Sequence, residues 1–140
     1  MLPSSLLAGA VLAGTFLLAA SVPVAAAGSD LDRYRWKSRV LVIAAEAGDP
    51  RAAAQERIAA AAVSGMRERD LVVVRAIGEG REAAGLRRRL GLPATGFRAV
   101  LVGKDGGAKL DAAEPIPGER LFSTIDAMPM RRDEAAGRRN

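Results

Sequence analysis

Two apolar segments of strand length, with a helix between them, constrain the fold of this chain more than any other feature. The segments RVLVIAA (residues 39–45) and LVVVRAI (residues 71–77) have the length and continuity of buried strands. Between them, Asp49 is suited to cap a helix and Pro50 to open it, so we expect a helix from residue 50 to about residue 67. This order predicts two parallel neighbouring strands.

One side of the expected helix is apolar and should pack on the sheet, whereas Gln55 falls largely outside that side. The residues of the apolar stripe are Ala54, Ile58, Ala61, Ala62 and Met66. The rest of the chain predicts a helix at 81–90, a hairpin with strands at 99–103 and 108–111, and a helix at 117–128 that Pro129 ends. In the second helix, the arginines 87 to 89 should lie around the solvent side.

The N-terminal segment has the pattern of a signal peptide. Residues 1–29 carry no charged side chain, residues 6–20 are apolar, and Ala25 and Ala27 form a small-x-small end. We therefore expect cleavage before Gly28 and a secreted or periplasmic protein, with no transmembrane segment once the signal is removed. An uncleaved anchor is the alternative. Residues 28–130 then form one domain, and residues 131–140 form a charged, flexible tail.

Composition excludes several classes of chemistry. The chain has no cysteine and no histidine, so thiolates, disulfides and imidazole bases are all absent. The net charge of +5 comes mostly from arginine, which suits anionic glycans and acidic peptides or proteins. The arginine runs have no interleaved aromatic residues, so nucleic acid is not an expected partner.

Four segments carry a resemblance to a known family. They are FRAVLVGKDGGAKL (residues 97–110), LFSTIDAMPMRR (residues 121–132), YRWK (residues 34–37) and RDLVVV (residues 69–74). They resemble the bacterial domain-of-unknown-function 4174 family, which is similar to the thioredoxin-like domain of vertebrate matrix proteins such as equarin and the sushi-repeat proteins. The resemblance implies an exported α/β protein with a single thioredoxin-like domain, and the expected order β-α-β-α-β-β-α is the thioredoxin arrangement.

The position of the thioredoxin Cys-Gly-Pro-Cys motif reads Gly48, Asp49, Pro50 and Arg51 here, and Arg98 stands where thioredoxins have a cis-proline. We therefore expect no thiol–disulfide oxidoreductase activity, no catalytic residue, no metal and no cofactor. The interpretation we favour is a non-enzymatic binding module. Its groove would be formed by Asp49, Arg51, Phe97 and Arg98 and would accept an acidic peptide, an acidic protein or an anionic glycan.

Two other functions stay open. A cysteine-free enzyme could use Glu46, Asp49 and Arg98, although Asp49 at a helix start is more often a cap. Methionine-based copper handling could use Met128 and Met130, with Met66 as a third ligand, although Met128 also fits a core stripe. Tyr34 and Trp36 could form a ligand platform or cover one end of the core.

Overall fold

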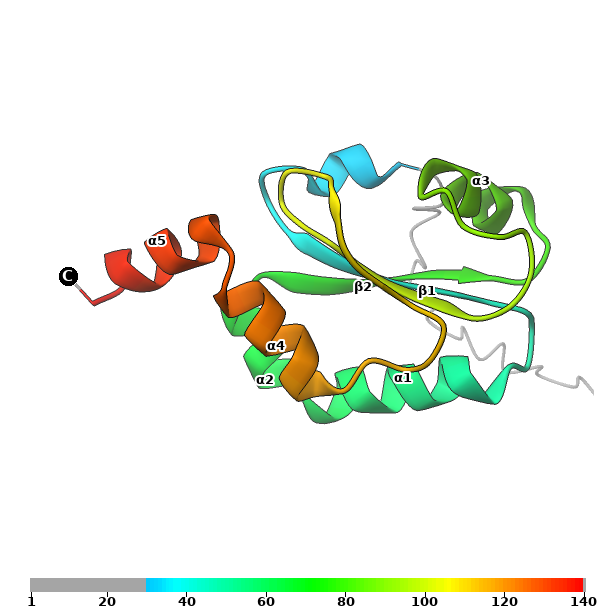
Figure 1. The fold of residues 1–140 in the computed structure, drawn as a ribbon, viewed down its shortest axis with the longest axis horizontal. Helices are drawn as coiled ribbons and strands as arrows, with labels where there is room; N and C mark the ends of the chain where they lie inside the picture. Colours follow the sequence, from blue (N-terminus) through cyan, green and yellow to red (C-terminus); the bar gives the residue numbers. More distant parts are fainter. Residues whose placement is uncertain (1–29, 140) are drawn as a thin grey trace, which may run out of the picture.

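The computed structural model describes residues 30–139, so the expected signal peptide, residues 1–27, lies outside the described residues. The described chain forms one mixed sheet with helices on both faces (Figure 1). In chain order the elements are a 3₁₀ turn η1 (Leu31–Tyr34), β1 (Arg39–Ala45), α1 (Pro50–Ala61), α2 (Val63–Glu68), β2 (Leu71–Ile77), α3 (Arg81–Arg89), β3 (Arg98–Val102), β4 (Ala108–Ala112), α4 (Gly118–Asp126) and α5 (Pro129–Gly137).

The sheet has the strand order β2-β1-β3-β4. Strand β1 pairs in parallel with β2, as the sequence predicts, and antiparallel with β3, and β3 pairs antiparallel with β4. The central strand β1 is buried along its whole length. Strand β2 is a half-buried edge instead of the fully buried strand that its composition suggests. Its Arg75 is exposed and pairs with Glu56 of α1, because an edge strand has solvent on one side.

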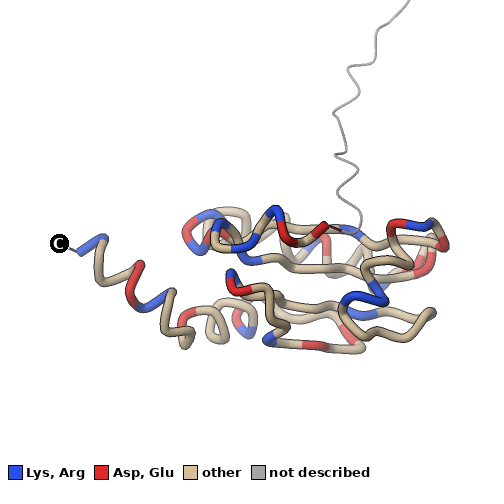
Figure 2. Tube along the Cα trace, turned by 90° about the horizontal axis from the view of Figure 1, so that it is seen from above, with Lys and Arg blue, Asp and Glu red and all other residues tan. Residues whose placement is uncertain are grey.

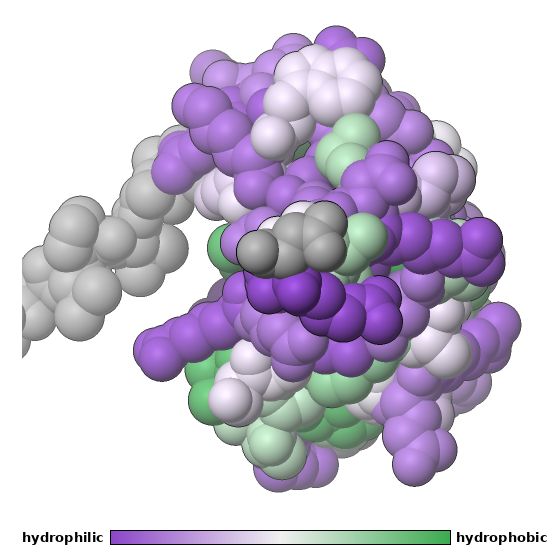
Figure 3. All heavy atoms as spheres, turned by 90° about the vertical axis from the view of Figure 1, so that its left-hand side faces the viewer, coloured by the Kyte–Doolittle hydropathy of each residue, from purple (hydrophilic) through white to green (hydrophobic). Residues whose placement is uncertain are grey.

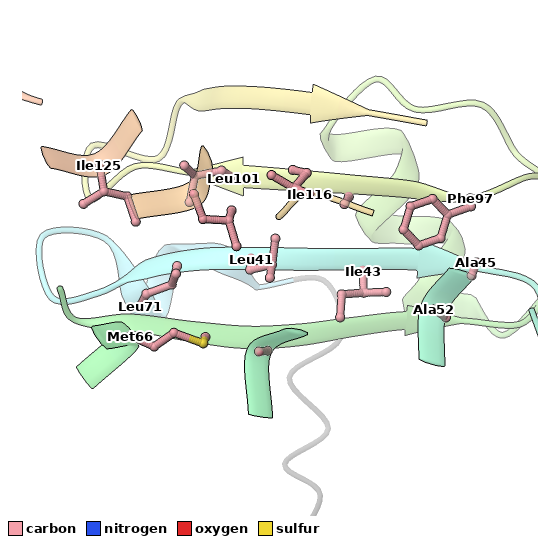
Figure 4. Packing of buried hydrophobic residues seen from close by; sticks show 13 residues of the cluster. Leu41, Ile43, Ala45, Ala52, Met66, Leu71, Phe97, Leu101, Ile116 and Ile125 are labelled. Carbon is pink, nitrogen blue, oxygen red and sulfur yellow. The ribbon is translucent and has the colours of Figure 1, made fainter. Parts of the chain in front are cut away.

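Two hydrophobic cores form because successive strand residues point to opposite faces. On one face, Leu41, Ile43 and Leu101 pack against α1, α2 and α4 (Figure 4). On the other face, Val40, Val42 and Val100 pack against α3 and η1. The α/β class predicted from the sequence is confirmed, with one helical layer on each side of the sheet (Figure 1).

The long helix expected after β1 begins as predicted but is interrupted. Asp49 caps α1 and Pro50 is its first residue. At Ala62 the backbone takes φ −113° and ψ 19°, outside the helical range, so a second helix, α2, follows. The assignment of Gln55 to the polar side was wrong. Gln55 is fully buried, because its amide donates to the carbonyl of Ile116 and accepts from the N–H of Ile116.

Helix α3 holds a second buried polar side chain that the sequence analysis placed in solvent. Arg87 is buried, and its guanidinium donates to the carbonyls of Pro93 and Gly96. It therefore fixes the loop that leads into β3. A charged group is tolerated at this position because backbone oxygens replace water as its partners.

The C-terminal segment differs most from its prediction. Pro129 does not only end α4; it is also the first residue of α5, where its missing N–H is not needed. The tail expected to be charged and flexible is therefore helical up to Gly137. In Figure 2, α5 extends away from the sheet and carries residues of both charges along its length.

Trp36 does not cover the core. Its side chain is 64% exposed, whereas Tyr34 packs partly against the core beside α3. Trp36 has φ 64°, in the left-handed region that a bulky residue rarely adopts. Its N–H donates to the carbonyl of Lys104 at 2.7 Å, which ties the segment before β1 to the β3–β4 turn.

Among the described residues, none of the helices has the length and apolar character needed to cross a membrane.

Candidate functional site

The loop after β1 places Asp49 and Arg51 against each other. Asp49 Oδ1 accepts hydrogen bonds from the N–H of Arg51 at 2.9 Å and from Arg51 Nε at 3.1 Å, and Asp49 Oδ2 lies 2.9 Å from Arg51 Nη2. The Arg51 side chain, together with its backbone N–H, holds the pKa of Asp49 below its ordinary value. A carboxylate whose pKa is lowered is a poor general base at neutral pH.

Phe97 joins this pair from the start of β3. The guanidinium carbon of Arg51 lies 5.5 Å from the centre of the Phe97 ring, and the ring itself is buried in the core beneath. Glu46 Oε1 accepts from the N–H of Gly96 at 3.1 Å, which connects the β1–α1 loop to the loop before β3. The structure thus places Asp49, Arg51 and Phe97 side by side.

Arg98 is not part of this group. Phe97 and Ala99 belong to the core beside α1, so the side chain of Arg98 between them points to the other face of the sheet. It forms an ion pair with Asp111 of β4 at 3.0 Å. The groove expected to contain both Arg51 and Arg98 is therefore divided by β3. Binding of an acidic partner at the Asp49–Arg51 surface stays a prediction.

The three methionines proposed for copper occupy different environments. Met66 belongs to α2 and is buried in the core, and Met128 packs partly against that core. Met130 is 37% exposed at the start of α5. Met128 and Met130, but not Met66, line the groove described next.

A groove of about 520 Å³ lies at the opposite end of the sheet from Asp49. One wall is apolar and consists of Ala127, Met128, Pro129 and Met130, where α4 gives way to α5. The facing wall is charged and comes from the start of β1 and the β3–β4 hairpin; it contains Arg39, Lys104, Asp105 and Lys109. Figure 3 views the end of the molecule from which α5 projects, where apolar patches lie between hydrophilic residues.

Two cations in the groove wall share one carboxylate of α5, an arrangement that the sequence analysis missed. Glu134 lies 2.6 Å from Lys104 Nζ and 3.2 Å from Arg39 Nη1. Lys104 Nζ also lies 2.9 Å from Asp70 Oδ2. Burial acts to raise the pKa of Glu134, but the hydrogen bonds from Lys104 and Arg39 outweigh burial and lower it. Glu134 is therefore held as a carboxylate.

Arg39 is the most unusual member of this cluster. Only 1% of it is exposed, and its Nε is buried without a hydrogen-bond partner among the described residues. A buried guanidinium needs acceptors on all of its N–H groups, so this site is incompletely satisfied. No local sequence pattern marks the cluster, because Arg39 and Glu134 are 95 residues apart in the chain.

A second cavity, of about 310 Å³, lies between α2, α4 and α5 and is polar. Its two carboxylates, Glu68 and Asp126, are both paired with arginines of the same cavity. Asp126 accepts from Arg69 and Arg131, and the Arg69 hydrogen bond is the main reason that the pKa of Asp126 is lowered. Arg131 also reaches Glu68, so this cavity mainly attaches α5 to the body of the protein. In residues 30–139, no three His, Cys, Asp or Glu side chains are grouped as a metal site would require.

Comparison with known proteins identifies a family and no characterised relative. The model of the family described as Domain of unknown function (DUF4174) matches residues 30–134, which include every strand and the start of α5. No curated protein and no solved structure gives a significant match to the chain. The match covers most of the chain and the whole sheet, and the chain therefore belongs to the DUF4174 family.

Proposed function

We propose that this chain is an exported, non-enzymatic binding module with a thioredoxin-like fold. The order of the elements supports the fold: a parallel β-α-β unit, a helix on the other face, and then an antiparallel hairpin followed by a helix. The placement of the antiparallel β3 directly beside β1 agrees with the thioredoxin arrangement. Export rests on the apolar N-terminal segment alone, and a secreted or periplasmic location follows from it.

The loop in the position of the thioredoxin motif argues against redox chemistry. The chain has no cysteine, and thiol–disulfide exchange requires a sulfur that can form a disulfide. Asp49 and Arg51, in the places of residues from that motif, satisfy each other and cap α1. We therefore assign this loop a structural role in holding α1 against β1.

The same contacts argue against a cysteine-free enzyme. Glu46 bonds to the backbone of Gly96, Asp49 bonds to Arg51, and Arg98 pairs with Asp111 on the other face. A general base needs a pKa close to the working pH, whereas the hydrogen bonds from Arg51 lower that of Asp49. These three residues have structural partners and do not converge on one space.

The observation that carries the proposal is the groove beside Met128 and Met130. Its volume of about 520 Å³ is in the range of small-molecule sites, roughly 300–1,000 Å³. Such sites combine apolar walls with a few polar groups that orient the ligand. Here the charged wall supplies Arg39 and Lys104, and its Asp105 and Lys109 pair with each other. We propose that the ligand binds in this groove and is released unchanged.

Native mass spectrometry of the protein, purified from cells that export it, tests the proposal. We expect a bound molecule whose mass is lost on denaturation. An insulin-reduction assay on the same material should show no turnover. Turnover at catalytic protein levels would contradict the proposal, and so would conversion of the bound molecule into a product. A bound copper ion would instead favour the methionine site.

A further inference from the structure

The groove beside α5 has two chemically different walls, and their combination restricts what it can hold. The apolar wall contains Met128, Pro129 and Met130, and Met130 is still 37% exposed. The charged wall contains Arg39 and Lys104, which are 1% and 10% exposed. An apolar tail fits the first wall. A small anionic group fits the second, because cations this far removed from water interact strongly with an anion.

Glu134 shows which anionic group these cations accept. Its carboxylate contacts Lys104 Nζ and both terminal nitrogens of Arg39, at 2.6, 3.2 and 3.4 Å. This is a carboxylate position built by β1 and the β3–β4 turn and filled by a residue of α5. Glu134 occupies the edge of the guanidinium formed by its two terminal nitrogens, while the buried Nε of Arg39 has no hydrogen-bond partner among the described residues.

The charges of the cluster limit how a second carboxylate could enter. Arg39 and Lys104 are positive, Glu134 and Asp70 are negative, and together they are neutral. Arg131 also lies 4.0 Å from Glu134, but its charge is already balanced by its ion pairs with Glu68 and Asp126. Another carboxylate added beside Glu134 would leave a buried net negative charge, which is unfavourable. One that replaces Glu134 keeps the cluster neutral.

The attachment of α5 permits this exchange. Helix α5 begins at Pro129, and Arg131 fixes its first turn by contacts with Glu68 and Asp126. Glu134 lies one turn further along, 4.0 Å from Arg131, so its release breaks this long contact and those to Lys104 and Arg39 while Arg131 keeps its ion pairs with Glu68 and Asp126. The contact between Glu134 and the groove wall is made of ion pairs, which salt and competing anions weaken.

From these observations we infer that the groove binds a small carboxylate with an apolar tail, whose head displaces Glu134 from Arg39 and Lys104. The tail lies along Met128, Pro129 and Met130. Glu134 is then an internal competitor that occupies the head position in the absence of ligand. This inference rests on the proposed binding function and adds to it the class of ligand and the residue that competes with it.

Decanoate titrated into the protein purified after export tests this inference by calorimetry and by the fluorescence of Trp36. Trp36 is the one tryptophan of the chain, and its N–H bonds to the carbonyl of Lys104. We expect decanoate to bind at least about tenfold more tightly than decanol, which lacks the charge. Equal binding of the two would overturn the assignment of the charged wall.

Variants with opposite expected effects make the test specific. Glu134→Gln should bind decanoate several-fold more tightly, because the internal competitor is gone. Because a partly unfolded chain would also bind decanoate through exposed apolar surface, the circular dichroism spectrum and urea midpoint of this variant must match those of a folded protein. Lys104→Met should bind about tenfold more weakly, and Met130→Glu, at an exposed position, should also weaken binding. Asp133→Asn, on the exposed side of α5, is the matched control and should leave the affinity unchanged.

The outcomes separate this inference from the proposed function. If decanoate fails to bind both the parent protein and Glu134→Gln, the ligand class is wrong. If Glu134→Gln binds no more tightly than the parent, the competition by Glu134 is wrong. A co-purified molecule that binds equally to the parent, Glu134→Gln and Lys104→Met would refute the inference and leave the binding function intact.

Discussion

Replacing Gln55 with leucine tests how strongly one buried amide stabilises the fold. Gln55 lies on α1, and its amide makes two hydrogen bonds to Ile116, in the segment before α4. The distances are 3.0 Å from Gln55 Nε2 to the carbonyl oxygen of Ile116 and 2.6 Å from the Ile116 nitrogen to Gln55 Oε1. Gln55 is 0% exposed and Ile116 1%, so water cannot replace these partners.

The magnitude follows from the two backbone groups that leucine leaves without a partner. Each buried, unsatisfied group costs about 1–3 kcal/mol, so the free energy of unfolding should fall by about 2–6 kcal/mol. That is a large part of the 5–15 kcal/mol typical of a domain, so the variant should be marginally stable. Urea unfolding followed by circular dichroism measures the difference. Arg57→Leu, on the exposed side of α1, is the control and should change stability by less than about 0.5 kcal/mol.

Gln55→Glu separates hydrogen bonding from packing at the same position. An ionised glutamate cannot donate to the Ile116 carbonyl, so this variant should be destabilised near neutral pH. A protonated glutamic acid can both donate and accept, so its deficit relative to the parent should shrink between about pH 7 and about pH 5. A loss below about 1 kcal/mol for Gln55→Leu, or a pH-independent deficit for Gln55→Glu, would refute the reasoning.

Four further outcomes are expected. Leu101→Ala, in a fully buried position of β3, should cost about 2–5 kcal/mol in urea unfolding, and a loss below 1 kcal/mol would contradict its central place in the core. The folded-state pKa of Glu134 lies below its ordinary value of 4.5. The stabilisation that its carboxylate gives to the folded state is therefore complete above that pH, and it is lost as the pH falls through the folded-state pKa. Because Glu134 attaches α5 to Arg39 and Lys104, the rate of proteolysis within α5 should increase in acid. In Glu134→Gln this rate should depend less on pH. Weak, salt-sensitive binding of an acidic peptide at Arg51 should disappear in Arg51→Ala and persist in Arg98→Ala; chemical shifts that are the same in both variants would indicate generic charge attraction. Intact-mass analysis of the exported protein should show a chain that begins at Gly28, and a full-length chain in membranes would favour an anchor.

The candidate site was predictable only where its determinants are close together in the sequence. The cap formed by Asp49 and its approach to Arg51 could be anticipated, because both follow from the chemistry of a helix start. The absence of Arg98 from that site could not be anticipated, because it depends on which face of the sheet the side chain of Arg98 occupies. One residue of shift along a strand reverses that face.

The amino-acid sequence by itself determined the strands, most of the helix starts and the absence of thiol chemistry. These features depend on local hydrophobic patterns, on proline and capping residues, and on composition. Only the tertiary structure decided that Gln55 is buried, that the tail forms α5, and that Arg39 and Lys104 meet Glu134. Gln55 and Arg39 are stable in the interior because distant segments supply their partners. The pairing of Arg39 with Glu134, 95 residues apart, exists only once the chain has folded.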